Sequence, residues 1–325
     1  MRKHFLVCLA LFAFIQVTKA QVNTITGTIN DGQGSPVRYV FVHDTKSQRA
    51  TFTDTLGNFS IRATPTSRLQ LQSAGHSDTI LNIPPGGKMQ VTLKTVADDT
   101  TKVHAGVKLI TETVRSTTEG DMGTVSSGGM ISGMKHQKDG TRGNRYFFDE
   151  FVPGYIISSD DKLVYNPNYR FNYDKIGGGL LMTEDNKTLT QMSGDQIKSF
   201  SIFGSDGTLH TFEMAPAVNS SHYVQVLSSG PKYAIYKLTL THLVKSDFTN
   251  AGITSHGADY DEFVDDKTYA VLDVASNKTV PLSLKKKSIK ADFAKETDKV
   301  NKYLAGHSGS IDDTYLADFG DYINQ

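Results

Sequence analysis

The chain has 325 residues, which is enough for about two domains, each with its own core. Lys plus Arg and Asp plus Glu both number 34, so the formal net charge is zero and the basic composition typical of a nucleic-acid-binding protein is missing. The single cysteine, Cys8, lies in the N-terminal segment, whose removal would exclude disulfides, Cys-ligated metals and Cys nucleophiles together. We therefore expect no nucleic-acid partner and no thiol chemistry.

The first 20 residues have the pattern of a signal peptide. Arg2 and Lys3 precede an apolar run from Phe5 to Ile15, and Ala20 is the small residue that signal peptidase prefers before its cleavage site. The apolar run is shorter than the ~20 residues of a membrane-spanning helix, and no later apolar segment reaches that length. The sequence predicts an exported protein, periplasmic, outer-membrane associated or secreted, with no transmembrane segment in the mature chain.

Residues 21–97 have the pattern of short strands separated by turns, as in "ITGTI", "VRYVFVHD", "RLQLQ" and "MQVTLK". In "FTDTLGNFSI", Asp54 can accept hydrogen bonds from N–H groups two or three residues on, and Gly57 can adopt the positive φ that closes a hairpin. A calcium loop needs oxygen ligands at several alternate positions, which this stretch does not supply. The pattern predicts a small β-sandwich in which Asp54 holds a structural turn.

The same region resembles the carboxypeptidase regulatory-like domain, a transthyretin-like β-sandwich common in exported Bacteroidetes proteins. The likeness lies in "ITGTINDGQGSPVRYVFVHD", "TFTDTLGNFSI", "LQLQSAGHSDTILNI" and "MQVTLK", with the family's pattern matched at Gly34, Pro36, Asp54, Gly57, Phe59 and Gly75. At His76 the sequence departs from the family, which usually has Tyr there. The resemblance implies a fold and an exported location, and no activity, because this module accompanies many different functions.

Residues 98–145 are rich in Thr, Gly, Ser and Met, as in "TEGDMGTVSSGGMISGM", and predict a flexible connection. Within them, "VKLITETV" is compatible with a strand. Ser126, Ser127 and Ser132 lack the flanking glycines of a nucleophile elbow, so this segment suggests no hydrolase motif.

Residues 146–325 predict an antiparallel β-meander followed, from about residue 284, by helices. Two apolar stripes at helical spacing indicate a C-terminal helical hairpin: Ile289, Phe293, Val300 and Leu304, then Tyr315, Leu316, Phe319 and Ile323. Gly306 is expected to end the first helix, and Ser310 with Asp313 has the spacing of a capping box. The predicted fold class is mainly β with a small α part. In pattern and order, "RYFFDEFVPGYI", "NPNYRFNYDKI", "DQIKSF", "YDEFVDDKTY" and "SLKKKSIK" resemble an uncharacterised domain of exported Bacteroidetes proteins, and the likeness implies no chemistry.

Two patterns are candidate metal sites. His210 and Glu213 form an HxxE pair similar to the zinc ligands of metallocarboxypeptidases, with His307 as a distant third ligand. Because "TLHTFEM" alternates as a strand, residues three apart point to opposite faces, which favours an ordinary surface histidine. The second pattern is a set of five carboxylates in "ADYDEFVDD" that suggests calcium: Asp259, Asp261, Glu262, Asp265 and Asp266. It lacks the glycine of an EF-hand loop, and an acidic, solvated loop ahead of "TYAVLDV" is the simpler interpretation.

Two further sets of residues are candidate binding surfaces. Four lysines at the start of the helical region are candidates for contact with anionic lipid, although a solvated helix face is favoured: Lys285, Lys286, Lys287 and Lys290. A set of aromatic residues suggests sugar stacking, although aromatics at period two favour a core: Tyr146, Phe147, Phe148, Phe151, Tyr155, Tyr165, Tyr169, Phe171 and Tyr173.

No pattern identifies a catalytic residue or a cofactor. We expect a non-catalytic exported interaction or structural module of the cell envelope, with an envelope protein or a glycan as its partner. Two alternatives stay open: a hydrolase whose site is assembled from residues distant in sequence, and a carbohydrate-binding protein that uses the Tyr- and Phe-rich segment.

Overall fold

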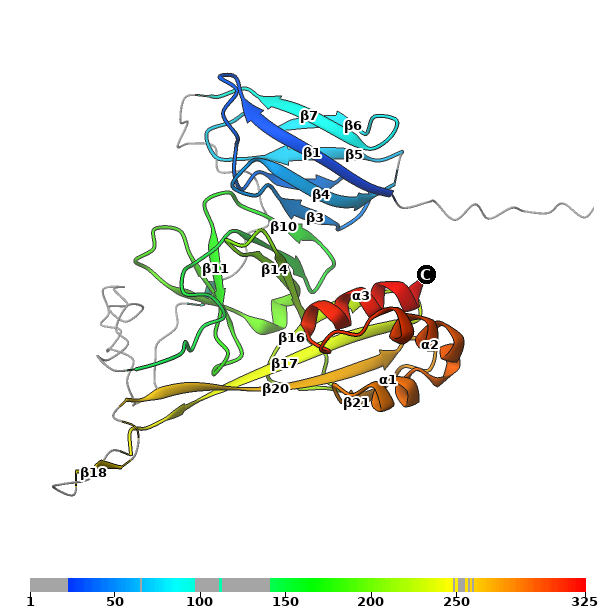
Figure 1. The fold of residues 1–325 in the computed structure, drawn as a ribbon. Helices are drawn as coiled ribbons and strands as arrows, with labels where there is room; N and C mark the ends of the chain where they lie inside the picture. The colour runs from blue at the N-terminus through cyan, green and yellow to red at the C-terminus, as the bar shows by residue number, and fades with distance from the viewer. Residues whose placement is uncertain are drawn as a thin grey trace, which may run out of the picture.

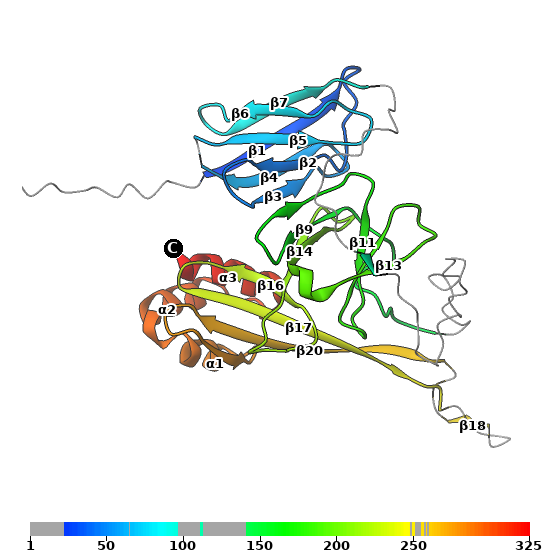
Figure 2. The same ribbon diagram turned by 180° about the vertical axis from the view of Figure 1, so that it is seen from behind.

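The computed structural model describes residues 23–64, 66–96, 111–112, 141–247, 249–250, 255–256, 258 and 260–325. In these residues the chain is mainly β with a small α part at its C-terminal end, as the sequence predicts. Figures 1 and 2 show an N-terminal β-sandwich beside a larger β body that carries the helices. The expected signal peptide, Cys8 and most of the expected connection lie outside the described residues.

The N-terminal body is a β-sandwich of two sheets. One sheet has the order β4-β1-β7, with β1 at Asn23–Asp31, β4 at Asn58–Ala63 and β7 at Lys88–Leu93. The other has the order β3-β2-β5-β6, at Ala50–Phe52, Phe41–Asp44, Arg68–Gln72 and Thr79–Asn82. Alternate residues of both sheets, such as Ile25, Ile29, Leu69 and Leu71, point inward and form one core.

The turn between β3 and β4 forms as the sequence predicts. Asp54 Oδ1 accepts hydrogen bonds from the backbone N–H groups of Leu56 and Asn58, each at 2.8 Å. Gly57 has φ +76°, and a Cβ there would lie 2.4 Å from the carbonyl oxygen of Ile29. The position therefore requires glycine both for its backbone conformation and for its close approach to β1.

The second body contains an eight-stranded sheet of order β10-β9-β14-β15-β16-β17-β20-β21. Its strands lie at Leu163–Val164, Gly154–Ser158, Ile197–Phe203, Leu209–Glu213, Val224–Ser229, Tyr233–Val244, Glu262–Asp273 and Lys278–Leu282. A four-stranded sheet of order β11-β12-β13-β8 has its strands at Arg170–Tyr173, Leu180–Thr183, Thr190–Met192 and Thr111–Glu112. The short pair β18 and β19 lies at Thr249–Asn250 and Ser255–His256, and η1 lies at Gly194–Gln196.

Two separate layers pack against the eight-stranded sheet. The four-stranded sheet packs against β9, β14 and β15, where Phe200 and Phe212 stack with ring centroids 4.9 Å apart. The helices α1 (Lys286–Asp292), α2 (Thr297–Gly306) and α3 (Asp313–Asn324) pack over Ile235 and Val271 of β17 and β20. Both predicted apolar stripes of the helical region are buried in this second cluster.

The helical region differs from the expectation in two details. The expected first helix is two helices, because the chain leaves helical geometry at Phe293 (φ −111°, ψ 32°) and continues through η2 (Ala294–Glu296) into α2. The capping box predicted at Ser310 is wrong: Asp312 caps α3, and its side chain accepts a hydrogen bond from Tyr315 N at 2.9 Å. No helix in the described part of the chain is both long and apolar enough to cross a membrane.

Part of the segment expected to be a connection belongs to the second body. Thr111 and Glu112 form β8, which pairs with β13 and falls within the stretch considered compatible with a strand. At the other end of the segment, Arg145 forms a two-point ion pair with Asp174, with Nε–Oδ1 at 2.9 Å and Nη2–Oδ2 at 2.6 Å.

Candidate functional site

The hairpin of β17 and β20 is the most extended feature of the second body. It has twelve consecutive register pairs, from Tyr233↔Asp273 to Val244↔Glu262. On one side, β16 pairs with β17 only as far as Lys237, and on the other side β21 pairs with β20 only from Tyr269 onward. We call residues 238–244 and 262–268 the arm, because this part of the hairpin extends past its neighbouring strands (Figures 1 and 2).

Most of the acidic segment lies on the arm. The acidic loop expected ahead of the strand is wrong for Glu262, Asp265 and Asp266, because β20 begins at Glu262 and these residues pair with β17. Asp265 and Asp266 therefore point to opposite faces of the arm. Asp259 lies outside the described residues, and among the described residues no three His, Cys, Asp or Glu side chains gather as a metal site would require.

Three residues of the acidic segment, Asp261, Asp265 and Asp266, have side-chain partners within the fold. Asp266 lies 3.3 Å from His242 Nδ1, and Asp261 lies 3.2 Å from Lys245 Nζ. Asp265 accepts hydrogen bonds from Lys175 Nζ at 2.8 Å and from Thr241 Oγ1 at 2.5 Å. Asp261 and Asp265 thus form local ion pairs with lysines, and Asp266 lies beside the His242 ring.

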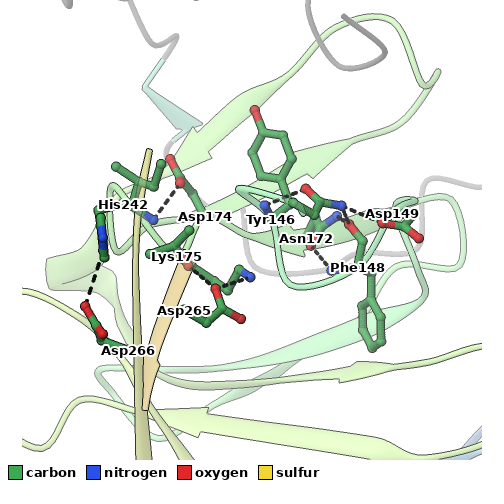
Figure 3. Close-up of polar contacts among 12 residues, drawn as sticks. Tyr146, Phe148, Asp149, Asn172, Asp174, Lys175, His242, Asp265 and Asp266 are labelled. Atoms are coloured by element: carbon green, nitrogen blue, oxygen red, sulfur yellow. Dashed lines mark hydrogen bonds and ion pairs between the residues drawn. The ribbon is translucent and has the colours of Figure 1, made fainter. Parts of the chain in front are cut away.

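Lys175 anchors the arm to the body (Figure 3). It follows β11 in the turn that Asp174 holds by accepting a hydrogen bond from Ile176 N at 3.0 Å. Its side chain is only 8% exposed and its ammonium group reaches Asp265 on the arm. Burial opposes ionisation of Asp265, yet the hydrogen bonds from Lys175 and Thr241 lower the pKa of its carboxyl.

A second anchor lies at the start of β20. Arg142 N donates to Asp261 O at 2.8 Å, and Phe263 N donates to Arg142 O at 2.9 Å. Arg142 therefore pairs in parallel with β20, opposite Glu262. Its guanidinium carbon lies 3.6 Å from the ring centroid of Tyr260, a cation–π contact. The two anchors hold the arm in a fixed direction.

His210 and Glu213 do not converge. Both lie on β15, and Glu213 Oε1 accepts a hydrogen bond from Tyr236 at 2.6 Å on one face of the sheet. On the opposite face, the His210 ring lies 5.0 Å from the ring of Phe147 and 5.5 Å from that of Phe148. His307 follows α2 and stacks on Tyr303 with centroids 3.9 Å apart. The separation of His210 and Glu213 agrees with the predicted strand alternation.

A row of polar side chains, which we call the polar row, crosses the helix-covered face of the sheet: His210, Gln225, Lys237, Tyr269 and Asp313. Gln225↔Lys237 and Lys237↔Tyr269 are register pairs on β16, β17 and β20. Asp313, in the first turn of α3, forms an ion pair with Lys237 and accepts a hydrogen bond from the Tyr269 hydroxyl at 2.9 Å. Gln225 Nε2 lies 3.1 Å from His210 Nδ1.

Burial sets the chemistry of the polar row. It lowers the pKa of His210, so the imidazole is neutral near pH 7. Burial and the Asp313 carboxylate together raise the pKa of the Tyr269 hydroxyl. Gln225 Oε1 is buried without a hydrogen-bond partner among the described residues. The sequence contained one signal of this row, because Lys237 interrupts the inward-pointing positions of the apolar strand "KYAIYKLTL".

The lysine and aromatic sets occupy different environments. Lys285, Lys286, Lys287 and Lys290 are exposed at the start of α1. The aromatic set is largely incorporated into the fold: three members are buried and the others are partly buried, namely Tyr155, Phe171 and Tyr173, then Tyr146, Phe147, Phe148, Phe151, Tyr165 and Tyr169. The preference for a core over a stacking platform is confirmed for the buried members.

The segment before β9 is tied to β11 by Asn172. Its side-chain amide donates to Phe148 O at 2.8 Å and to Glu150 O at 3.1 Å, and its Oδ1 accepts from Phe148 N at 3.1 Å. Asn144 Nδ2 donates to Asp149 Oδ1 at 2.7 Å in the same segment (Figure 3). These bonds hold Phe147 and Phe148 against His210.

The two bodies share an apolar contact, which we call the seam. It joins the outer face of the sheet β3-β2-β5-β6 to β9, β10 and β14, and its buried members are Phe41, Ala50, Phe52, Tyr155, Ile157 and Phe203. A separate contact joins β4 to α3, where Arg62 and Asp321 form an exposed ion pair at 3.5 Å. Phe41 and Phe52 are fully buried although they point away from the sandwich core, and burial on both faces explains the consecutive apolar residues Val40, Phe41 and Val42 of "VRYVFVHD".

Comparison with known proteins does not place the chain in a family. The sequence matches no protein-family model, and a search of curated proteins finds no similar sequence. The likeness of the N-terminal residues to the carboxypeptidase regulatory-like pattern therefore stays a prediction from the sequence.

Proposed function

We propose that this chain is a non-catalytic, exported interaction module of the cell envelope that binds a protein partner through the arm. The observation that supports this most directly is the combination of a fixed arm with an exposed face. Lys175 and Arg142 hold the arm in place, while His242, Val244 and Asp266 remain exposed on the face that does not contact Lys175. A binding surface that is already held in its bound shape loses little conformational entropy on association.

The seam gives the proposal a second support. Because the sandwich and the larger body pack through buried aromatic side chains, the arm has a fixed direction relative to both. We also propose that residues 21–97 are a carboxypeptidase regulatory-like domain. The β3–β4 turn at Asp54 and Gly57, in the pattern common to that family, supports this assignment.

The proposal is tested by affinity capture with the mature protein, residues 21–325, from an extract of its own cell envelope. The arm variant combines Val244→Ser with Val264→Ser, on one face of the arm. The control combines Ile80→Ser with Leu284→Ser, two exposed apolar residues outside the arm that match the exposed Val244, whereas Val264 is half-buried. We expect a stoichiometric partner with the wild type and the control, and about tenfold less with the arm variant.

Two results would contradict the proposal. One is equal capture by the arm variant and the control, which would place the binding surface elsewhere. The other is stoichiometric zinc or calcium in the purified protein together with no partner, which would reopen a metal-dependent function. Metal content is measured on the sample that is used for capture.

A hydrolase is a second candidate, and one observation favours it. The polar row brings together His210, Lys237 and Asp313, which are distant in sequence, beside the unpartnered oxygen of Gln225. Activity-based profiling of the purified protein with hydrolase probes tests this candidate. Labelling that is lost in His210→Gln and retained in His307→Gln would support it, and absence of labelling would contradict it.

A further inference from the structure

Within the described residues, one edge of β20 has no partner strand between two segments that already pair with it. Arg142 pairs at Glu262, and β21 begins to pair at Tyr269. Between them, residues 264–268 have no ladder partner on their outer side in the described part of the chain. β17 occupies only the inner side.

The register identifies which backbone groups face outward. Asp261 O and Phe263 N both bond to Arg142, so the odd-numbered residues of β20 direct their backbone groups away from β17. The N–H and C=O groups of Asp265 and Lys267 therefore face the open edge. Unpaired backbone groups in a row are a template for another strand.

The chain itself uses this edge for pairing. Arg142 joins it in parallel at one end and Leu282 joins it in antiparallel at the other, so the open stretch is continuous with two established contacts. Its five residues span about 17 Å, the length of a short strand. The side chains around it are polar, with Asp265, Asp266, Lys267 and Thr268 all exposed.

We propose that residues 264–268 of β20 bind an extended segment of the protein partner by β-strand addition. This inference rests on the proposed function and specifies how that function is carried out. Main-chain hydrogen bonds to Asp265 and Lys267 supply the attachment. The exposed Asp266 carboxylate favours a basic or hydroxyl side chain opposite it and disfavours an acidic one.

The test separates the backbone of Lys267 from its side chain. Lys267→Pro removes an outward-facing N–H and leaves the bonds to β17, since proline is tolerated where the N–H of an edge strand faces solvent. Lys267→Ala removes the side chain only. In the capture experiment we expect Lys267→Ala to retain the partner within about twofold and Lys267→Pro to lose about tenfold. Thermal unfolding of both variants checks that the fold is intact.

Hydrogen exchange tests strand addition to β20 even if Lys267→Pro fails to fold. The amides of Asp265 and Lys267 should exchange fast in the free wild type and slowly in the complex. Slow exchange in the free monomer would show that this chain already fills the edge, and slow exchange in a homodimer would make a second copy the occupant. Either result overturns the inference.

The two proposals fail in distinguishable ways. Equal capture by Lys267→Pro and Lys267→Ala, with a partner present, overturns strand addition and leaves the interaction module standing. Absence of any partner with the wild type overturns both.

Discussion

The ring of Phe41 stacks on that of Tyr165 across the seam, with centroids 3.9 Å apart and planes inclined by 13°. Phe41 belongs to β2 of the sandwich and Tyr165 follows β10 of the larger body. Phe52 and Tyr155 lie within 6.4 Å of each other in the same cluster, so several rings share the contact. The two bodies are therefore expected to unfold as one unit.

Phe41→Ala should uncouple them. Loss of a buried phenylalanine costs about 3 kcal/mol, and here part of that cost falls on the contact between the bodies. We expect the single calorimetric transition of the wild type to split into two. Leu56→Ala, at a residue that is 66% exposed, is the control and should change stability by less than about 0.5 kcal/mol. A single, uniformly lowered transition in Phe41→Ala would show that the bodies do not depend on the seam.

Lys175→Met should weaken the arm and change its response to acid. Removing one partner of a buried ion pair costs about 3 kcal/mol, and about 2 kcal/mol is expected here because Asp265 is partly exposed. The lowered pKa of Asp265 stabilises the wild type above about pH 4, and this contribution is lost as the pH falls through the folded-state value.

Denaturant titrations of the wild type and Lys175→Met between pH 7 and pH 2.5 measure this difference. The gap between the two proteins should shrink toward the acidic end. A gap that is independent of pH would mean that the ion pair contributes little beyond packing. Lys162→Met, at an exposed pair with Asp160, is the matched control and should show little change.

His210 should make the fold less stable in mild acid. Burial lowers the pKa of its imidazole, so the unfolded chain binds a proton more readily than the folded chain. The stabilising contribution is complete above about pH 6.5 and decreases as the pH falls through the lower folded-state value. The imidazole titration, followed by NMR, should have a midpoint below 6.5. A midpoint above 6.5 would contradict the burial of a neutral ring.

Two glycines provide a matched test of close approach. Gly57 and Gly86 both have positive φ, at +76° and +87°, but a Cβ at Gly57 would lie 2.4 Å from Ile29 O and a Cβ at Gly86 would have no neighbour within 4 Å. Gly86→Ala should cost about 1 kcal/mol for its backbone conformation alone. Gly57→Ala should cost about 3 kcal/mol, because the steric clash adds to this. Equal losses of stability for the two variants in thermal unfolding would show that β1 moves to accommodate the added methyl group at residue 57.

Two substitutions at the N-terminus of α3 distinguish the observed cap, Asp312, from the expected one, Ser310. Asp312→Ala should cost about 1 kcal/mol, since its carboxylate accepts the Tyr315 N–H. Ser310→Ala should change stability by less than about 0.5 kcal/mol, because no cap depends on it. The reverse order of the two effects in urea titrations would restore the capping box at Ser310.

Local patterns were sufficient where the determining contacts are local. The turn at Asp54 and Gly57 depends on residues within five positions of each other, and the buried stripes of α2 and α3 follow directly from helical spacing. The opposition of His210 and Glu213 likewise follows from strand alternation. The break at Phe293 was not predicted, because the apolar period continues through it.

The candidate site depended on pairing between distant segments. The sequence predicts an acidic loop at Asp265, because nothing near it in the chain indicates that residues 238–244 pair with this segment or that Lys175 reaches it. The polar row joins β15, β16, β17, β20 and α3, whose neighbourhood is set by sheet order. In the sequence, only Lys237 indicates the polar row, because it is a charged residue at an inward-pointing position of an apolar strand.

By itself, the sequence determined the fold class, the inward faces of strands and helices, and the turn at Asp54, because each depends on periodicity or on a few consecutive residues. Only the tertiary structure decided that the outward-facing Phe41 lies against Tyr165, that Lys175 anchors the arm, and that Asp265 and Lys267 have no ladder partner on the outer side of β20 among the described residues. The physical reason is that side-chain periodicity specifies which face of a strand is buried but not which strand lies beside it.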